Sequence, residues 1–210
     1  MSRGRLITLE GGEGAGKSTL LAGIEQWLQG RGVPVLRTRE PGGTPLGEAL
    51  RTLLLDAERD AVCAESELLL MFAARAELVR KVVQPALASG RWVLADRFTD
   101  ASYAYQGGGR GQPQARIREL ERWAALDLQP DLTLLLDLPV SAGRARVAGR
   151  EAPDRIERED DTFFERVRGA YRARVEAAPQ RFRVLRAEAS AAAVLAQALE
   201  QIAPLLRGRP

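Results

Sequence analysis

Gly11-Gly-Glu-Gly-Ala-Gly-Lys-Ser18 is the stretch that decides the fold class of this chain. It fits the pattern G-x-x-x-x-G-K-[ST], whose backbone N–H groups surround the phosphates of a nucleoside triphosphate. An apolar run at 5–10 predicts a buried strand before it, and apolar residues at helical spacing in 17–29 predict a helix after it. We therefore expect Lys17 to reach the β- and γ-phosphates and Ser18 to offer its hydroxyl to Mg²⁺.

The predicted ATP-binding residues cover the whole loop and the start of the helix. They are Gly11, Gly12, Glu13, Gly14, Ala15, Gly16, Lys17, Ser18 and Thr19. Glycines allow the backbone to wrap closely around an anion and to adopt positive φ values.

Short apolar runs alternate with helical patterns along the rest of the chain. Further strands are predicted at 33–37, 92–95, 132–138 and 182–185, and further helices at 46–56, 65–89, 100–107, 113–127, 142–149, 162–178 and 189–206. We expect a break or kink at Pro85, and we expect Gly107-Gly-Gly109 to break the helix before it. Near-continuous apolar strands between helices predict an α/β fold with a parallel sheet covered on both faces.

The amino-acid composition excludes several kinds of active site and partner. The 210 residues are 45% hydrophobic and 28% charged, as in an ordinary globular protein, and they contain no histidine. This absence excludes histidine-based catalytic triads and histidine-ligated zinc. The net charge is +3 without interleaved basic and aromatic residues, so no nucleic-acid partner is expected. No run reaches the length of a membrane span, and the single cysteine, Cys63, fits a reducing compartment, so we expect a cytoplasmic protein.

Asp96 directly follows the predicted strand 92–95. The carboxyl ends of parallel strands border the ligand crevice in such folds, and a carboxylate there can organise Mg²⁺. An ordinary helix-capping or loop aspartate is the alternative interpretation of the same spacing. Ser18 and Asp96 are the predicted metal-site residues.

Five longer strings, taken with the loop, resemble bacterial thymidylate kinases over nearly the whole chain. They are Thr38-Arg-Glu-Pro-Gly-Gly-Thr44, Asp96-Arg-Phe98, Ala104-Tyr-Gln-Gly-Gly-Gly-Arg-Gly111, Pro130-Asp-Leu-Thr133 and Asp154-Arg-Ile-Glu157. The resemblance implies a P-loop NTPase fold with a five-stranded parallel sheet, a single domain spanning 1–210 with a mobile lid around 149–161, and a homodimer. It also implies transfer of the ATP γ-phosphoryl group to dTMP with Mg²⁺, giving dTDP and ADP for dTTP synthesis.

Site residues carry over from this resemblance position by position. The implied catalytic residues are Lys17, Arg97 and Arg150; the implied dTMP-binding residues are Arg51, Phe72, Arg75, Arg97, Ser102, Tyr105 and Gln106. Arg146 is expected near adenine and Arg155 is expected to help close the lid. Because the acceptor phosphate is already ionised, the reaction needs positioning and charge neutralisation rather than a general base.

One position departs from the family pattern. The family has an aromatic residue four positions before the base-contacting arginine, whereas this chain has Met71 there and Phe72 one position later. Either side chain could pack on the base.

Two other functions remain open at this point. A kinase for a different nucleoside monophosphate would share the loop, the lid and the sheet, and only the base pocket separates it from a dTMP kinase. A nucleotide-dependent switch protein is the second, although the chain lacks an Asn-Lys-x-Asp string for guanine and such a switch has no use for Arg51 and Arg97.

Overall fold

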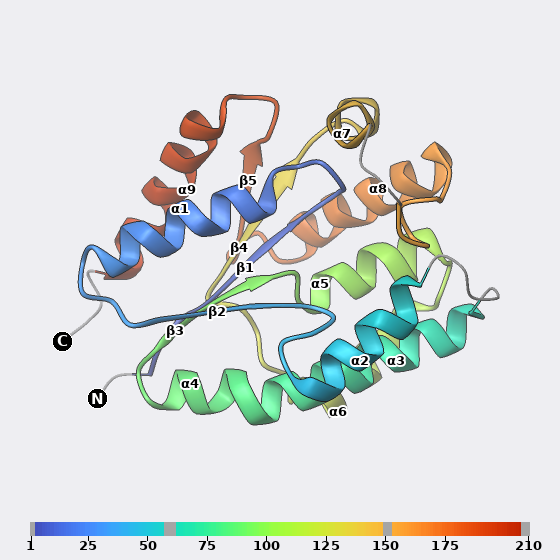
Figure 1. The fold of residues 1–210 in the computed structure, drawn as a ribbon, viewed down its shortest axis with the longest axis horizontal. Helices are drawn as coiled ribbons and strands as arrows, with labels where there is room; N and C mark the ends of the chain where they lie inside the picture. The colour runs from blue at the N-terminus through green and yellow to red at the C-terminus, as the bar shows by residue number, and fades with distance from the viewer. Residues whose placement is uncertain (1–2, 57–61, 149–152, 207–210) are drawn as a thin grey trace.

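The computed structural model describes residues 3–56, 62–148 and 153–206. Five strands form one parallel sheet in the order β2-β3-β1-β4-β5 (Figure 1). The strands are β1 (Leu6–Gly11), β2 (Val35–Arg39), β3 (Trp92–Asp96), β4 (Leu132–Asp137) and β5 (Phe182–Arg186). The predicted α/β fold class and the five parallel strands are therefore confirmed.

Helices cover both faces of the sheet (Figure 1). One face packs against α1 (Lys17–Gln29) and α9 (Ala191–Leu206). The other face packs against the run α3 (Ala64–Leu78), η1 (Val79–Val83) and α4 (Gln84–Ala88), and against α5 (Thr99–Ser102), η2 (Tyr103–Gly109) and α8 (Asp161–Ala177). Helices α2 (Pro45–Leu55) and α6 (Gln114–Ala124) pack on α3, and α7 (Val140–Val147) packs on α8.

The strand register gathers three polar segments at one edge of the sheet. Leu9 pairs with Asp96, and Gly11 pairs with Leu136, which precedes Asp137. The loop after β1 and the residues after β3 and β4 consequently face one another, at the edge where parallel sheets bind ligands.

The second strand begins two residues later than predicted. Gly32 adopts a φ of +69°, and Pro34 precedes the strand with its carbonyl oxygen accepting the Trp92 N–H at 2.8 Å. Because proline has no N–H to donate, regular pairing starts at Val35. Val33 is still buried, which explains why its apolar character suggested a strand.

Two predicted helix breaks are wrong in detail. Helical structure continues through Pro85, and the irregularity is a wide π turn just before it, where the Gln84 N–H bonds the Val79 carbonyl five residues back. Helical structure also continues through Gly107–Gly109. A Cβ atom on Gly108 would lie 2.6 Å from Ala170 Cβ, so a glycine there permits close packing on α8 rather than ending a helix.

No helix in the described ranges is both long enough and apolar enough to cross a membrane.

Candidate active site

The loop after β1 has the backbone conformation of a phosphate cradle. Gly14 and Gly16 adopt φ values of +69° and +92°, which side-chain-bearing residues rarely adopt. Lys17 folds back so that Nζ donates to the carbonyl oxygens of Gly12 at 2.9 Å and Gly11 at 3.2 Å. Burial and the positive charge of Arg97 lower the pKa of Lys17 from its ordinary value. A bound anion would relieve this unfavourable environment.

Arg97 follows β3 and is held in a strained conformation at the same edge. Its φ of 70° is unusual for a non-glycine residue and is worth about 1–3 kcal/mol of strain. Its guanidinium donates to Glu13 Oε1 at 2.6 Å, to the hydroxyls of Tyr105 at 2.9 Å and Tyr171 at 3.1 Å, and to the Gly11 carbonyl at 3.0 Å. The surrounding contacts thus aim a positive charge at the loop.

Asp96 and Ser18 line the same cleft. The Oδ1 atom of Asp96 is buried and has no hydrogen-bond partner among the described residues, which fits a carboxylate that coordinates a cation. The described residues contain no cluster of three or more cysteine or acidic side chains that could hold a metal by themselves. Mg²⁺ commonly uses one or two protein oxygens and completes its shell with phosphates and water, so this donor set fits the ion.

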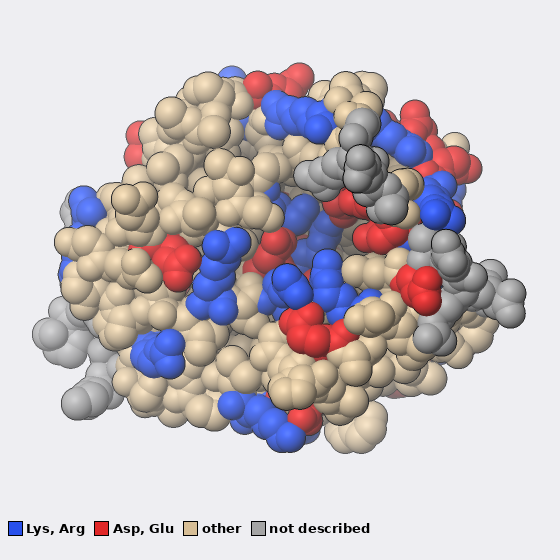
Figure 2. Space-filling model, in the orientation of Figure 1, with Lys and Arg blue, Asp and Glu red and all other residues tan. Residues whose placement is uncertain are grey.

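A cleft of about 380 Å³ brings together most of the predicted site residues. In Figure 2 lysine, arginine and acidic side chains gather around a hollow on the face shown. The predicted residues that line the cleft are Glu13, Gly14, Ala15, Gly16, Lys17, Ser18, Thr19, Arg51, Arg75, Asp96, Arg97, Ser102, Tyr105, Gln106 and Arg146. Arg150 lies outside the described residues. Arg146 donates to the carbonyl oxygen of Gly14 at 3.4 Å, which places it against the loop.

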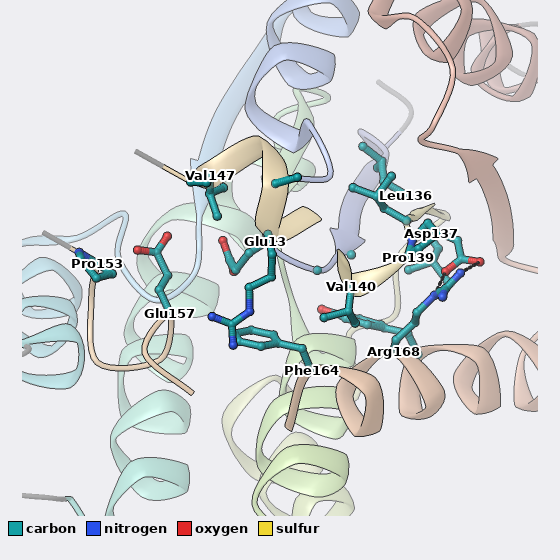
Figure 3. Close-up of a pocket in the computed structure, with 18 of the residues that line it drawn as sticks. Glu13, Leu136, Asp137, Pro139, Val140, Val147, Pro153, Glu157, Phe164 and Arg168 are labelled. Carbon is teal, nitrogen blue, oxygen red and sulfur yellow. Dashed lines mark hydrogen bonds and ion pairs between the residues drawn. The ribbon is translucent and has the colours of Figure 1, made fainter. Parts of the chain in front are cut away.

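Gly11 and Gly12 border a second, larger cavity behind the loop, of about 610 Å³ (Figure 3). Its wall includes Val140 and Phe164, and Arg168 there is bound to Asp137 at 2.7 Å. By volume alone, this cavity would be the preferred candidate for the active site. The predicted lysine and arginine residues, however, line the smaller cleft, and so does Asp96 with its unpaired Oδ1 atom. The smaller cleft is therefore the candidate active site.

Arg75 forms the floor of the cleft at the end away from the loop. It is 2% exposed, and its Nε donates to Glu40 Oε2 at 2.7 Å. Its Nη1 donates to the Ser102 hydroxyl at 3.0 Å and its Nη2 to the Phe98 carbonyl at 3.2 Å. Its Nη2 also forms an ion pair with Glu40 Oε2 at 2.7 Å, so three residues hold the guanidinium in place. Ser102, a second predicted base-contacting residue, therefore lies directly beside Arg75.

Phe72 does not line this cleft, whereas Met71 does. Phe72 is 2% exposed and packs in a core cluster with Leu68 and Ile117. Its ring lies 4.4 Å from the Arg75 guanidinium carbon and so supports that side chain. The placement of Phe72 in the binding pocket has to be corrected, because the helix turns Met71 toward the cleft.

Arg51 reaches the cleft from α2 and donates to the Pro41 carbonyl at 3.1 Å. Burial and the neighbouring charge of Arg39 lower the pKa of Arg51. Arg39 also lines the cleft and was missed by the sequence analysis, although it belongs to the string that begins at Thr38. Glu48 accepts a hydrogen bond from Arg39 at 2.7 Å but is half exposed, so an anion can still compete for the two arginines.

Glu10 and Tyr171 were also missed. Glu10 is fully buried at the end of β1 and accepts hydrogen bonds from the Phe98 N–H and the Tyr171 hydroxyl, both at 2.8 Å. Burial, and then the charge of Asp100, raise the pKa of Glu10 to about 8. Glu10 therefore fixes the backbone directly after Arg97. A charged residue inside an apolar strand, immediately before the loop, was the available signal.

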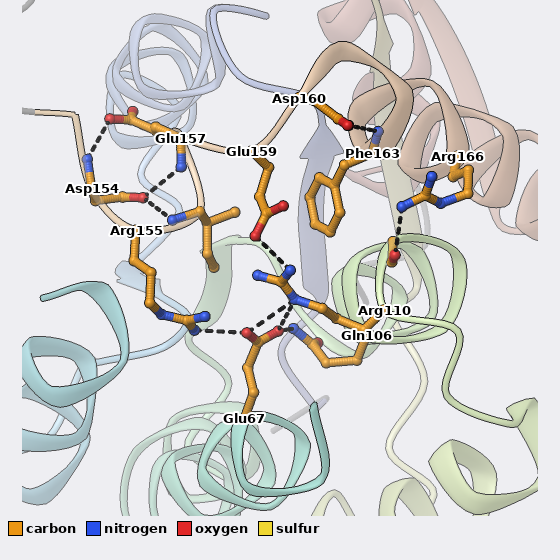
Figure 4. Close-up of polar contacts among 12 residues, drawn as sticks. Glu67, Gln106, Arg110, Asp154, Arg155, Glu157, Glu159, Asp160, Phe163 and Arg166 are labelled. Atoms are coloured by element: carbon orange, nitrogen blue, oxygen red, sulfur yellow. Dashed lines mark hydrogen bonds and ion pairs between the residues drawn. The ribbon is translucent and has the colours of Figure 1, made fainter. Parts of the chain in front are cut away.

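The described part of the segment between α7 and α8, residues 153–160, lies against α2 and α3 (Figure 4). Arg155 donates to the Leu54 carbonyl at 3.0 Å and to Glu67 Oε2 at 2.7 Å. Asp154 Oδ1 accepts the N–H groups of Ile156 and Glu157 at 2.8 and 2.9 Å, which forms a tight turn. Arg155 is thereby docked over the edge of the cleft.

Comparison with known proteins agrees with this geometry. The family model described as thymidylate kinase matches residues 9–198. A thymidylate kinase from Methylobacillus flagellatus is 57% identical over 87% of this chain and 89% of its own length. Thymidylate kinases from Alkalilimnicola ehrlichii and Chromobacterium violaceum are 55% and 53% identical, each over 97% of this chain and over 94% and 96% of their own lengths. The chain belongs to the thymidylate kinase family.

Proposed function

We propose that the protein is a dTMP kinase that transfers the γ-phosphoryl group of ATP to dTMP and releases dTDP and ADP. The observation that carries the proposal is a single cleft that holds a phosphate loop, a second set of arginines and a buried polar end. A nucleotide switch has no need for a second phosphate site, whereas a phosphotransferase that joins two phosphorylated molecules requires one. Family membership then identifies the acceptor class.

In this proposal the loop and Lys17 bind the triphosphate, and Arg51 and Arg39 bind the acceptor phosphate. Arg97 lies between the two sets, where negative charge concentrates during transfer. Its partners in the structure are a half-buried carboxylate, two hydroxyls and a carbonyl, so a phosphate can compete for it. Mg²⁺, held by Asp96 and Ser18, would supply further positive charge to the phosphates.

Residues 149–161 form the lid of this proposed enzyme. Arg155 anchors the segment on α2 and α3, and Arg146 touches the loop from α7. Arg150 would supply a further positive charge at the transferring group. On this assignment Arg150→Ala lowers kcat far more than it weakens ATP binding, which comparison of kcat with the ATP dissociation constant would test.

The base of dTMP would occupy the end of the cleft bounded by Arg75, Ser102 and Gln106, with Met71 against its face. Tyr105 would lie beside the sugar, because its hydroxyl bonds both Arg97 and Glu13 at the boundary between the two ends. Since a single methyl group is worth only about 1–3 kcal/mol in an apolar pocket, dUMP should react more weakly rather than be excluded.

A homodimer is part of the proposal. Leu69 on α3 and Trp123 on α6 are 57% and 75% exposed, and these two helices pack side by side. Exposed apolar side chains of this size are typical of interaction surfaces and support an interface between subunits. Light scattering during gel filtration should give twice the mass of one chain, and Trp123→Glu should reduce it to that of a single chain.

We also propose a cytoplasmic location, which the free thiol of Cys63 supports because disulfides are uncommon in that compartment.

The central test is ADP release from ATP and Mg²⁺ with dTMP, dUMP, dCMP, dGMP, dAMP or no acceptor. Strong turnover with dTMP and weaker turnover with dUMP would support the proposal. Preference for another monophosphate would retain the phosphate assignments and reject those at the base end. Hydrolysis that ignores every acceptor would reject a kinase.

A further inference from the structure

Glu67 on α3 is not one of the site residues assigned above, but its carboxylate contacts two of the side chains predicted for the site, Gln106 and Arg155. It is 1% exposed and accepts four contacts from three side chains (Figure 4). Gln106 Nε2 donates to Oε1 at 2.9 Å, and Arg155 donates to Oε2 at 2.7 Å. Arg110 Nε lies 3.2 Å from Oε2 and 3.4 Å from Oε1.

Glu67 is ionised in this setting. Burial alone would raise its pKa, but the hydrogen bonds from Gln106 and Arg155 and the charges of Arg110 and Arg155 hold the pKa of Glu67 below its ordinary value. An ionised carboxylate has no proton to donate and only accepts hydrogen bonds. Whichever group of Gln106 faces Glu67 must therefore be the NH₂ group.

The orientation of the Gln106 amide follows from this constraint. With Nε2 turned to Glu67, its oxygen is left for the cleft that Gln106 lines. Among the described residues none donates a hydrogen bond to that oxygen in the structure. The cleft thus presents an acceptor at this position.

Pyrimidine bases differ in the polarity of the edge that such an acceptor would meet. Thymine and uracil carry an N–H at N3, whereas cytosine has a lone pair there and an amino group at the neighbouring carbon. A site built to hydrogen-bond one polarity rejects the opposite one strongly, because a buried polar group is left unpaired.

On the basis of the proposed function, we propose that Glu67 is a positioning residue that selects the base by fixing the Gln106 amide with its oxygen toward the cleft. The same carboxylate binds Arg155 of the lid. Docking of the lid and orientation of the selecting amide therefore share one buried group.

Glu67→Gln tests this directly, because it keeps the shape of the side chain but replaces a carboxylate, which only accepts hydrogen bonds, with an amide, which also donates them. The two arginines next to Oε2 bind the new amide oxygen, so its NH₂ group takes the place of Oε1 and faces Gln106. Gln106 then turns over and presents its own NH₂ group to the cleft. The expected result is a preference for dTMP over dCMP that is smaller by about tenfold or more, mainly in KM and in the dissociation constants.

The readout is the ratio of kcat/KM for dTMP to that for dCMP, together with the two dissociation constants from calorimetry. A ratio taken on one preparation does not change with the fraction of folded enzyme, so partial unfolding leaves it intact. Glu65→Gln is the matched control, because Glu65 lies on the same helix and also accepts from a glutamine, Gln112, at 3.1 Å, but is exposed. Its ratio should equal that of the parent.

Glu67→Asp provides a second variant. It keeps an acceptor-only group, so the ratio should be retained even where both kcat/KM values fall. An unchanged ratio in Glu67→Gln, or an equal loss in Glu67→Asp, would overturn the inference, since packing rather than polarity would then be decisive. A parent that binds dTMP selectively without phosphorylating it would reject the proposed function, and the dissociation constants would still test Glu67.

Discussion

The two ends of the cleft hold their cations with different partners. At the phosphate end, Lys17 is bound by two backbone carbonyls, and Arg97 by a carbonyl, two hydroxyls and the half-buried Glu13. At the base end, Arg75 and Arg155 are paired with the fully buried carboxylates Glu40 and Glu67. Neutral partners can be exchanged for a phosphate, whereas a buried ion pair is expensive to open. The first set can thus exchange its partners for substrate phosphates, whereas the second is fixed in place and keeps the shape of the base end, with Arg75 still lining the cleft.

Lys17→Ala should have the largest effect, because it removes a positive charge that donates its hydrogen bonds to two backbone carbonyls and so remains able to bind a phosphate. We expect kcat for ADP release with dTMP to fall by at least about 10³-fold, with little change in thermal stability. Lys81→Ala is the control, since the chain has two lysines and Lys81 is exposed and paired with Glu77. A small change in kcat for Lys17→Ala would remove the functional distinction between the two ends.

Arg97→Lys should have the next largest effect. Lysine keeps the charge but loses the planar fork that reaches several oxygens, so kcat should fall by about 10²- to 10³-fold. Arg91→Lys is a suitable control, because Arg91 precedes β3 at the opposite edge of the sheet and is exposed. Steady-state kinetics with both substrates varied would show whether the loss is in kcat, as expected, or in KM.

Met71→Ala and Phe72→Ala separate a binding residue from a scaffold residue one position apart. We expect Met71→Ala to raise KM for dTMP about tenfold while the melting temperature stays close to that of the parent. Phe72→Ala should instead lower the free energy of unfolding by about 3–5 kcal/mol, because it empties a buried site beneath Arg75. Reversed effects would assign the base contact to Phe72.

The pH dependence of stability should show the smallest effect. Glu10 has a pKa of about 8 in the folded protein against 4.5 for the free group, so the folded state binds a proton that the unfolded state releases between these values. The contribution to stability is therefore fully present below about pH 4.5 and is lost as the pH rises through about 8. Denaturation midpoints of Glu10→Gln should fall less than those of the parent from about pH 5 to 8, with the exposed Glu119→Gln as control.

The phosphate end could be predicted from the sequence, because its geometry is local. Residues 11–16 form a loop whose shape depends on its own glycines, and the adjacent strand β3 ends at Asp96, directly before Arg97. The strands and most helices could also be predicted from the sequence, since the spacing of their apolar residues reflects burial on one or both faces.

The base end was harder to predict from the sequence, because it is assembled from elements that are far apart along the chain. Its contacts join Glu67 on α3 with Gln106 on η2 and with Arg155 before α8. The spacing of these residues along the chain does not predict that they are in contact. The choice between Met71 and Phe72 depended on the rotation of one helix by a single residue. The π turns were missed for a related reason, since they respond to packing and to Pro85 rather than to a local motif.

The close contact between η2 and α8 has a mechanical consequence. Gly108 and Gly109 leave no room for side chains between the two helices, and the Phe163 ring fills the space beside Gly109. Tyr105 and Gln106 are on η2, and α8 begins where the segment carrying Arg155 ends. This packing therefore makes the positions of Tyr105 and Gln106 depend on the position of α8, to which the segment carrying Arg155 leads.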